Sequence, residues 1–214
     1  MFIPSKFRQE NIEELIAIMQ KYSFAALVTQ SEKGIEATHL PMIVSSDSDK
    51  LYLKAHIARA NPIWESVASG SNVLVIFNGP NCYISPNHYP TKKEAGKAVP
   101  TWNYVVVHVE GSISFIHDSE WIYDAIDTLT TTHESGLKEP WSISDAPEEY
   151  IQKMLPAIVG IEIEITSMIG QWKLSQNQPA VNQLGVVEGL SKSLDSSTVE
   201  VACMVSSNIE KVNS

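Results

Sequence analysis

Four short clusters occur between Thr38 and Tyr104: THLP (38–41), HIARANP (56–62), GPNCYIS (79–85) and VPTWNY (99–104). Each cluster joins the predicted end of a strand to polar, aromatic or cationic side chains. Residues of these types gather where a fold surrounds a ligand that has both polar and apolar parts. We therefore expect the four clusters to line one ligand-binding site.

The segments around these clusters predict a mainly β fold. Polar turns separate the first three strand-like runs, so we expect these three strands to form an antiparallel meander. Helical periodicity appears near the N-terminus, after the capping residue Asp118, and again before the last strand. The pattern indicates a small barrel with helical additions, of α+β class, over 1–178, followed by a helical tail over 179–214. The strand-like runs are 24–30, 36–44, 51–56, 72–79, 81–85, 101–116 and 158–174, and two of the helices are 11–21 and 148–155.

The composition is that of a folded, acidic protein. Of the 214 residues, 43% are hydrophobic, and 15 Lys and Arg stand against 25 Asp and Glu, for a net charge of −10. Because DNA affinity rests on Lys and Arg that neutralise phosphates, this balance disfavours direct DNA binding. A local basic patch on an assembled dimer stays an alternative.

Nothing in the sequence predicts a membrane partner. No apolar run is long enough to span a bilayer, and the N-terminal sequence MFIPSKFRQENIEEL lacks the apolar core of a signal peptide. We therefore expect a cytoplasmic protein.

HIARANP carries the strongest local signal. It begins at the end of a strand that carries Lys54 and His56, and it places Arg59 in the turn after this strand. A short helix then starts, with Asn61 as N-cap and Pro62 as first residue. A helix start offers unpaired backbone N–H groups and the positive end of the helix dipole, which together favour a phosphate. Cations and free amides would then converge on one spot. The alternative is a strand-to-helix turn with surface cations.

THLP places Thr38 and His39 inside a strand that Pro41 interrupts. Proline removes a donor from the strand ladder, so this strand is expected to lie at a sheet edge or to carry a bulge. Thr38 can donate to a ligand or to a neighbouring carbonyl. A lone histidine in a strand is more often a hydrogen-bonded structural residue than a catalytic one.

VPTWNY brings Trp102, Asn103 and Tyr104 together after a long polar loop. Such a cluster can stack on a planar ring and bond its heteroatoms, because Trp and Tyr combine apolar area with a polar tip. The alternative is that strand alternation places Trp102 and Tyr104 on one core face.

KLSQNQP (173–179) ends the last strand with many hydrogen-bond donors. These donors suit either the carbonyls of a heterocycle or a simple polar strand exit.

The sequence lacks the common catalytic signatures. It contains no GxSxG, no Walker-type loop, no GxGxxG and no HExxH. Its two cysteines, Cys82 and Cys203, lie far apart and are expected to be small core residues. We predict no metal site and assign no catalytic residue.

At this point the motifs form a recognisable set, and the chain resembles the PaiB-like family, the FMN-binding negative transcriptional regulators, over nearly its full length. The order and spacing of the motifs are more specific than any one of them. The motifs are ATHLP (37–41), HIARANP (56–62), GPNCYIS (79–85), VPTWNY (99–104), HVEG (108–111), and IVGIEIEIT (158–166) followed by KLSQN (173–177).

The resemblance implies an FMN-binding split β-barrel, related to pyridoxamine-phosphate oxidase and flavin-reductase-like proteins. Such proteins are homodimers that hold the flavin at the dimer interface, with both chains contributing. Carried over by motif, the FMN phosphate is expected near Lys54, His56, Arg59 and Asn61. The isoalloxazine ring is expected among Thr38, His39, Trp102 and Asn103, with Lys173, Ser175 and Gln176 of the other subunit.

The sequence is compatible with three functions. The resemblance implies a repressor of genes for degradative enzymes and sporulation. DNA is a partner only on the strength of the family's name. The alternative is an FMN-dependent oxidoreductase or flavin reductase that uses NAD(P)H, with the lysine-rich loop 86–100 as a lid. A haem-binding relative, with His39, His88 or His108 as axial ligand, ranks last because the sequence singles out no one histidine.

Overall fold

The computed structural model describes residues 1–213, apart from the side chains at 95 and 211–213. The chain forms two compact units. Unit 1 consists of residues 1–15, 78–107 and 169–214, and unit 2 of residues 16–77 and 108–168. Each unit is therefore assembled from segments that are distant in the sequence. The predicted division at residue 178 stays a prediction.

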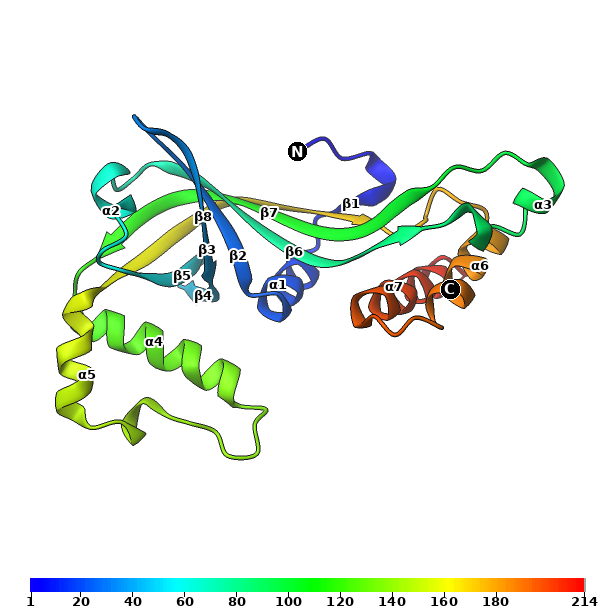
Figure 1. The fold of residues 1–214 in the computed structure, drawn as a ribbon. Helices are drawn as coiled ribbons and strands as arrows, with labels where there is room; N and C mark the ends of the chain where they lie inside the picture. Colours follow the sequence, from blue (N-terminus) through cyan, green and yellow to red (C-terminus); the bar gives the residue numbers. More distant parts are fainter. Residues whose placement is uncertain (214) are drawn as a thin grey trace. The chain divides into compact units, whose positions relative to one another are not determined.

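The elements confirm a mainly β chain with helical additions (Figure 1). The strands are β1 (Arg8–Gln9), β2 (Phe24–Ser31), β3 (Gly34–Pro41), β4 (Ile43–Asp47), β5 (Lys50–Ala58), β6 (Asn72–Ile84), β7 (Thr101–Ile116) and β8 (Ile158–Lys173). The α-helices are α1 (Ile12–Lys21), α2 (Ile63–Ser66), α3 (Lys92–Ala95), α4 (Ser119–Glu134), α5 (Glu148–Met154), α6 (Ala180–Leu190) and α7 (Ser196–Asn213). Short 3-10 turns are η1 (Ser5–Phe7), η2 (Pro86–His88), η3 (Ile143–Asp145) and η4 (Leu155–Ala157).

The strands form one eight-stranded sheet in the order β3-β2-β6-β7-β8-β5-β4, with β1 paired to β8. Both antiparallel pairings of the predicted meander are present, β2 with β3 and β4 with β5, but the three strand runs do not form one continuous meander. The run 36–44 splits at Met42, whose N–H donates to the Ser23 carbonyl, so β3 and β4 lie at opposite ends of the strand order. Pro41 ends β3, which is an edge strand as the proline predicts.

Alternation along β5 separates the core of unit 2 from its surface. Leu53, Ala55 and Ile57 are buried, while Lys54 and His56 point to the other face and are half-buried. Successive side chains of a strand point to opposite faces, so this pattern follows from the sequence directly. The candidate cations therefore share one face of β5.

Two glycines allow close packing in unit 2. A Cβ on Gly111 would lie 2.5 Å from the Glu164 carbonyl oxygen, so β7 and β8 approach closely at this glycine. A Cβ on Gly160 would lie 2.4 Å from the Trp121 ring. Trp121 of α4 therefore lies directly on the β8 backbone. Neither site has room for a larger residue without a shift of its neighbours.

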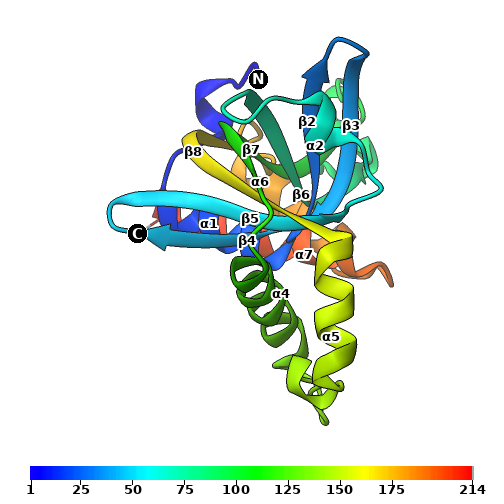
Figure 2. The same ribbon diagram turned by 90° about the vertical axis from the view of Figure 1, so that its left-hand side faces the viewer.

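Helix α4 of unit 2 begins with a side-chain cap. Asp118 Oδ1 accepts a hydrogen bond from the Trp121 N–H at 2.8 Å, which confirms the predicted cap of α4. Figures 1 and 2 show α4 and α5 side by side in two perpendicular views. No helix among the described residues is long and apolar enough to cross a membrane.

The C-terminal helices belong to unit 1, where they are attached to β6. The Ser197 hydroxyl accepts from the Asn81 N–H and donates to the Asn81 carbonyl, both at 3.0 Å.

The two cysteines of unit 1 differ in burial. Cys82 is buried, and burial, with the nearby Asp195 carboxylate, raises the pKa of its thiol to about 11. Cys203 is exposed, so its expected place in the core is wrong.

Candidate functional site

The predicted site residues fall into two groups, one in each unit. The unit 2 group is Thr38, His39, Lys54, His56, Arg59 and Asn61, and the unit 1 group is Trp102, Asn103, Lys173, Ser175 and Gln176.

Lys54 and His56 of the unit 2 group face helix α4. Lys54 Nζ lies 3.8 Å from a Glu162 carboxylate oxygen and 5.4 Å from the centre of the Trp121 ring. His56 stands opposite Gly160 of β8, next to the position that Trp121 covers. Burial lowers the pKa of His56, so its neutral form is favoured. The lysine is loosely paired, and the histidine would need a nearby anion to hold its proton.

Arg59 is engaged by the backbone. Its Nε donates to the Pro156 carbonyl at 2.6 Å and its Nη2 donates to the Ile158 carbonyl at 2.9 Å. Its Nη1 lies 3.2 Å from His117 Nδ1, and its guanidinium lies 5.7 Å from the centre of the Trp64 ring. The guanidinium thus ties the end of β5 to the start of β8. Its assignment to a phosphate stays a prediction.

Asn61 lies one residue before Pro62, which is the N-cap of a very short helix, so its predicted place as N-cap is wrong by one residue. Its Oδ1 accepts a hydrogen bond from the Ile63 N–H at 3.1 Å. Helix α2 begins one residue later than expected and has only four residues. Its dipole is therefore small, and it contributes less to anion binding than a full helix would.

Thr38 and His39 lie on the edge strand β3, opposite Leu27 and Ala26 of β2. His39 is exposed and stacks on Phe24, with ring centres 6.1 Å apart and an interplanar angle of 27°. Thr38 is half-buried and points to the other face of the strand. The structure therefore does not place these two neighbours on one surface.

In the unit 1 group, Trp102 is the accessible residue. Its side chain is 54% exposed, and its ring meets the ring of Tyr83 edge to face, with centres 6.2 Å apart. Lys173 Nζ donates to the Trp102 carbonyl at 2.8 Å and to the Thr101 hydroxyl, and it lies 5.9 Å from the centre of the Tyr104 ring. Burial lowers the pKa of Lys173. These side chains form an aromatic surface with one cation beside it.

Asn103 and Ser175 are buried together. The Asn103 Nδ2 donates to the Ser175 hydroxyl at 2.9 Å, while its Oδ1 has no hydrogen-bond partner. Ser175 adopts a left-handed backbone conformation with φ of 65°, which is uncommon for a residue other than glycine and clusters at functional sites. Asn103 and Trp102 are consecutive strand residues and point to opposite faces, so they do not line one surface.

Gln176 closes the turn after β8. Its Nε2 donates to the Trp172 carbonyl and its Oε1 accepts from the Leu174 N–H, each at 2.7 Å. Its polar atoms are thus used to hold the turn. Gln176 therefore acts here as part of a simple polar exit from β8, which is one of the two roles expected for KLSQNQP (173–179).

Sequence reasoning missed two aromatic contributors. Trp121 covers Lys54 from a helix that begins more than 60 residues later, and no local pattern marks this contact. Tyr83 belongs to the GPNCYIS cluster, and its alternation with Cys82 could have marked it as the outward residue.

The chemistry of the two groups fits a flavin nucleotide. An exposed indole with a second ring at its edge suits a planar heterocycle, and an unpartnered buried Asn103 Oδ1 shows that the unit 1 group is not fully satisfied. The loosely paired Lys54 and the half-buried His56 suit an anion. Among the described residues, no group of three or more His, Cys, Asp or Glu is placed to hold a metal ion.

Comparison with known sequences identifies the family. Residues 1–167 match the family described as "Putative FMN-binding domain". The chain is 29% identical over 211 residues to the protease synthase and sporulation protein PAI 2 of Bacillus subtilis (strain 168), with 99% of each chain covered. It is 30% identical over 200 residues to an uncharacterised protein of Aspergillus fumigatus, with 74% of this chain and 77% of that protein covered.

Comparison with solved structures identifies the fold. The FAD and haem binding protein of Mycobacterium smegmatis has a TM-score of 0.57 at 13% identity, covering 78% of this chain and 73% of that chain. The flavocytochrome Anf3 of Azotobacter vinelandii has a TM-score of 0.50 at 13% identity, covering 78% and 69%. At such low identity these likenesses concern the fold alone. The family match over residues 1–167 shows that this chain is a member of the PaiB-like family of FMN-binding proteins, and its fold is a split β-barrel.

Proposed function

We propose that this chain is a flavin-binding regulatory protein that acts as a homodimer, with FMN held where the two subunits meet. The observation that carries the proposal is the match to PAI 2, because it spans 99% of both chains and so includes the C-terminal helices beyond residue 167. Occupancy or redox state of the flavin would change the contacts of the dimer with a partner. By family analogy, the controlled genes are those of degradative enzymes and sporulation.

Each group would bind a different part of FMN. The exposed Trp102 ring and its neighbour Tyr83 would pack against the isoalloxazine ring. Lys54 and His56 would attract the phosphate, which in turn would favour the charged form of His56. FMN, when bound, supplies reversible electron transfer. The protein supplies binding, orientation and control of access.

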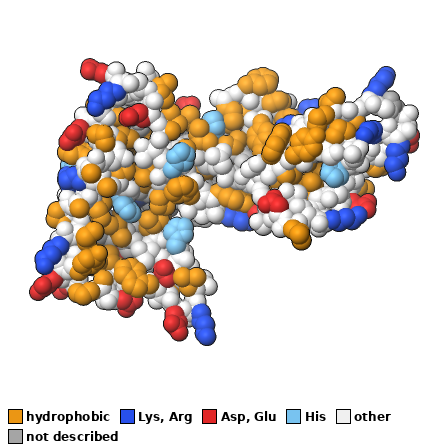
Figure 3. Space-filling model, viewed as in Figure 1, with side chains coloured by type: hydrophobic (Ala, Val, Ile, Leu, Met, Phe, Trp, Pro, Cys, Tyr) orange, Lys and Arg blue, Asp and Glu red, His pale blue; other side chains and the backbone are white. Residues whose placement is uncertain are grey.

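An uncovered apolar sheet face supports a homodimer. On one face of β3, β2 and β6, Phe24 is 66% exposed and Ile35 is 74% exposed, and the residues between them are mainly apolar. The register aligns Ala26 with His39 and Ile76, and Val28 with Ala37 and Leu74. Figure 3 shows hydrophobic side chains in this region with histidines among them. A contiguous apolar face of this kind is typical of a protein–protein interface.

The charge of the chain favours action through a protein partner. With 15 cationic and 25 acidic residues, the chain carries a net charge of −10, which disfavours contact with the DNA backbone. A repressor built this way would act by binding another regulatory protein. Direct operator binding would require a local basic patch on the dimer.

The first test is an absorbance titration of the purified protein with FMN, followed by steady-state oxidation of NADH and NADPH by the complex. Saturation at one FMN per chain without steady oxidation supports a regulator. Steady oxidation would instead support the flavin reductase alternative. Absence of FMN binding would overturn the proposal.

The second test is the oligomeric state, measured by light scattering with and without FMN. Ile35→Glu places a charge on the apolar sheet face and is expected to convert a dimer to a monomer. Leu137→Glu is the control, because Leu137 is 56% exposed and does not belong to that face. A wild-type monomer, or a dimer unaffected by Ile35→Glu, would contradict the assigned interface.

A further inference from the structure

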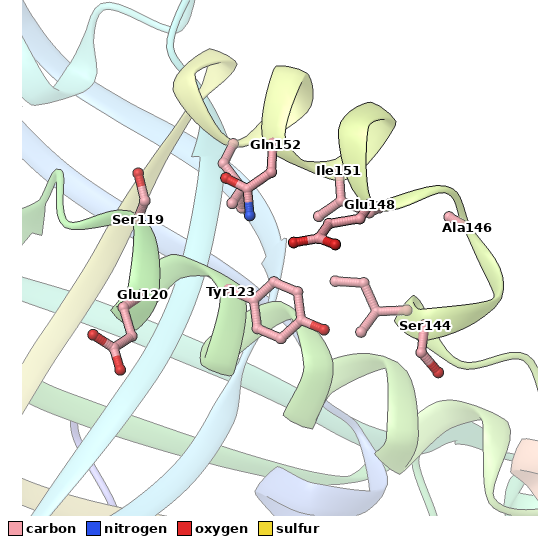
Figure 4. Close-up of a pocket in the computed structure, with 10 residues that line it drawn as sticks. Ser119, Glu120, Tyr123, Ser144, Ala146, Glu148, Ile151 and Gln152 are labelled. Atoms are coloured by element: carbon pink, nitrogen blue, oxygen red, sulfur yellow. The ribbon is translucent and has the colours of Figure 1, made fainter.

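A cavity of about 600 Å³ lies between α4 and α5 in unit 2 (Figure 4). Its volume is within the range of about 300 to 1,000 Å³ that small-molecule sites occupy. None of the predicted flavin residues lines it, so it is a separate site. The lining residues are Ser119, Glu120, Tyr123, Ile143, Ser144, Ala146, Glu148, Ile151, Gln152 and Leu155.

The floor of the cavity is apolar. Ile143 and Leu155 are almost fully buried, at 5% and 4% exposed, and Ile151 is half-buried. These residues come from η3, η4 and α5, which enclose the start of α4. The floor can therefore pack against the hydrocarbon part of a ligand and gain from its removal from water.

The rim of the cavity carries negative charge without positive charge. Glu120 and Glu148 are the charged residues of the lining, and no Lys, Arg or His is among them. Figure 4 shows the Glu148 carboxylate directed to the space above the Tyr123 ring, with the Gln152 amide on the same side, whereas the Glu120 side chain points away. One carboxylate, one amide and one aromatic ring thus converge on the cavity mouth.

A purely local role explains only part of this arrangement. Glu148 lies in the first turn of α5, where any carboxylate stabilises the helix through its dipole. The neighbouring Glu149 lies in the same turn and serves the dipole equally, but it does not line the cavity. The convergence with Tyr123 above an apolar floor is not required for a helix start. It does match the requirements of a cation with an apolar body.

We propose that this cavity binds a small organic ammonium compound. The ammonium group would lie between the Glu148 carboxylate and the Tyr123 ring face, where charge attraction and a cation–π contact add together. Gln152 would accept one of its hydrogen bonds. The apolar body would rest on Ile143 and Leu155. A carboxylate or phosphate ligand would be repelled by Glu148.

The proposal is tested with n-hexylamine as probe, and with 1-hexanol and hexanoate as neutral and anionic counterparts of equal chain length. Binding to the full-length protein is followed by NMR chemical-shift titration. Hexylamine is expected to saturate, with the largest shifts in α4 and α5, and to bind about five-fold more tightly than hexanol. Hexanoate is expected to bind most weakly. Equal affinity of hexylamine and hexanol, or no saturation, would overturn the proposal.

A matched pair of variants separates the site from general electrostatics. Glu148→Gln is expected to weaken hexylamine binding about five-fold, while Glu149→Gln changes it less than two-fold. Both variants remove one first-turn carboxylate from the same helix, so their effects on α5 itself are comparable. Tyr123→Leu keeps apolar bulk but removes the ring and should weaken hexylamine more than hexanol. Equal losses in the two glutamate variants would overturn the assignment of Glu148, and the readout does not depend on FMN.

Discussion

The polar atoms of the two groups of predicted flavin residues have different partners. In unit 1, Lys173 and Gln176 donate to nearby backbone carbonyls, and the exposed member is the aromatic Trp102. In unit 2, Arg59 donates to two backbone carbonyls, while Lys54 has a long ion pair with Glu162. Unit 1 therefore offers an aromatic surface on strands β6 and β7, and unit 2 offers cationic charge. Substitutions in each group should give different signatures.

The largest effect is expected on stability, from Arg59→Ala. Removal of two charge-assisted hydrogen bonds to the carbonyls of Pro156 and Ile158 should lower the free energy of unfolding by about 3 kcal/mol, measured by urea denaturation without FMN. Arg59→Lys should recover part of this loss. If stability is unchanged while FMN affinity falls, Arg59 is a ligand residue and the contrast between the units disappears.

The next effect concerns FMN affinity and unit 1. Loss of an aromatic surface beneath a planar ring is worth ~2 kcal/mol, so Trp102→Ala should weaken FMN binding about thirty-fold in an absorbance titration. Trp102→Phe should retain most of the affinity. Trp141→Ala is the control, because Trp141 is 44% exposed and lies outside both groups. Equal affinities for Trp102→Ala and wild type would remove unit 1 from the ring site.

A smaller effect is expected from the charge that unit 2 offers. Lys54→Met should weaken FMN binding about five-fold, because one partly screened contact with a phosphate is worth ~1 kcal/mol. Lys50→Met provides the comparison on the same strand, since Lys50 also pairs with a β8 carboxylate, Glu164, at 2.6 Å. The affinity of the Lys50 variant should stay within two-fold of wild type. Equal losses in the two variants would indicate long-range charge rather than a site at Lys54.

The smallest effect is a dependence of stability on pH. Burial lowers the pKa of both His56 and His108 in the folded protein. The unfolded chain therefore binds more protons, so stability is fully present above about pH 6.5 and declines as the pH falls toward the folded pKa values. Denaturation between pH 5 and 8 should show a shallower slope for the double variant His56→Gln/His108→Gln. An unchanged slope would show that other groups control it.

How far the sequence predicts this molecule depends on the distance between the partners. Alternation placed Lys54 and His56 on one face of a strand, and Asp118 identified the start of α4, because both signals are local. The partners of Arg59 lie 97 and 99 residues away and are backbone carbonyls, which no side-chain pattern reveals. For the same reason, the covering of Lys54 by Trp121 could not be predicted. The antiparallel pairing of neighbouring strand runs was predicted correctly, but the continuous meander was not, because β3 ends at Pro41 and β4 lies at the other end of the strand order.

The unequal burial of the two cysteines gives this protein a built-in labelling position. At neutral pH the buried Cys82, with its thiol pKa raised to about 11, is protonated and shielded, whereas Cys203 on α7 is open to reagents. A nitroxide attached to the unmodified sequence will therefore mark one place per chain. In a homodimer, electron–electron dipolar spectroscopy would then report one distance between the two labels. Recording that distance before and after addition of FMN would show whether the flavin rearranges the pair of subunits.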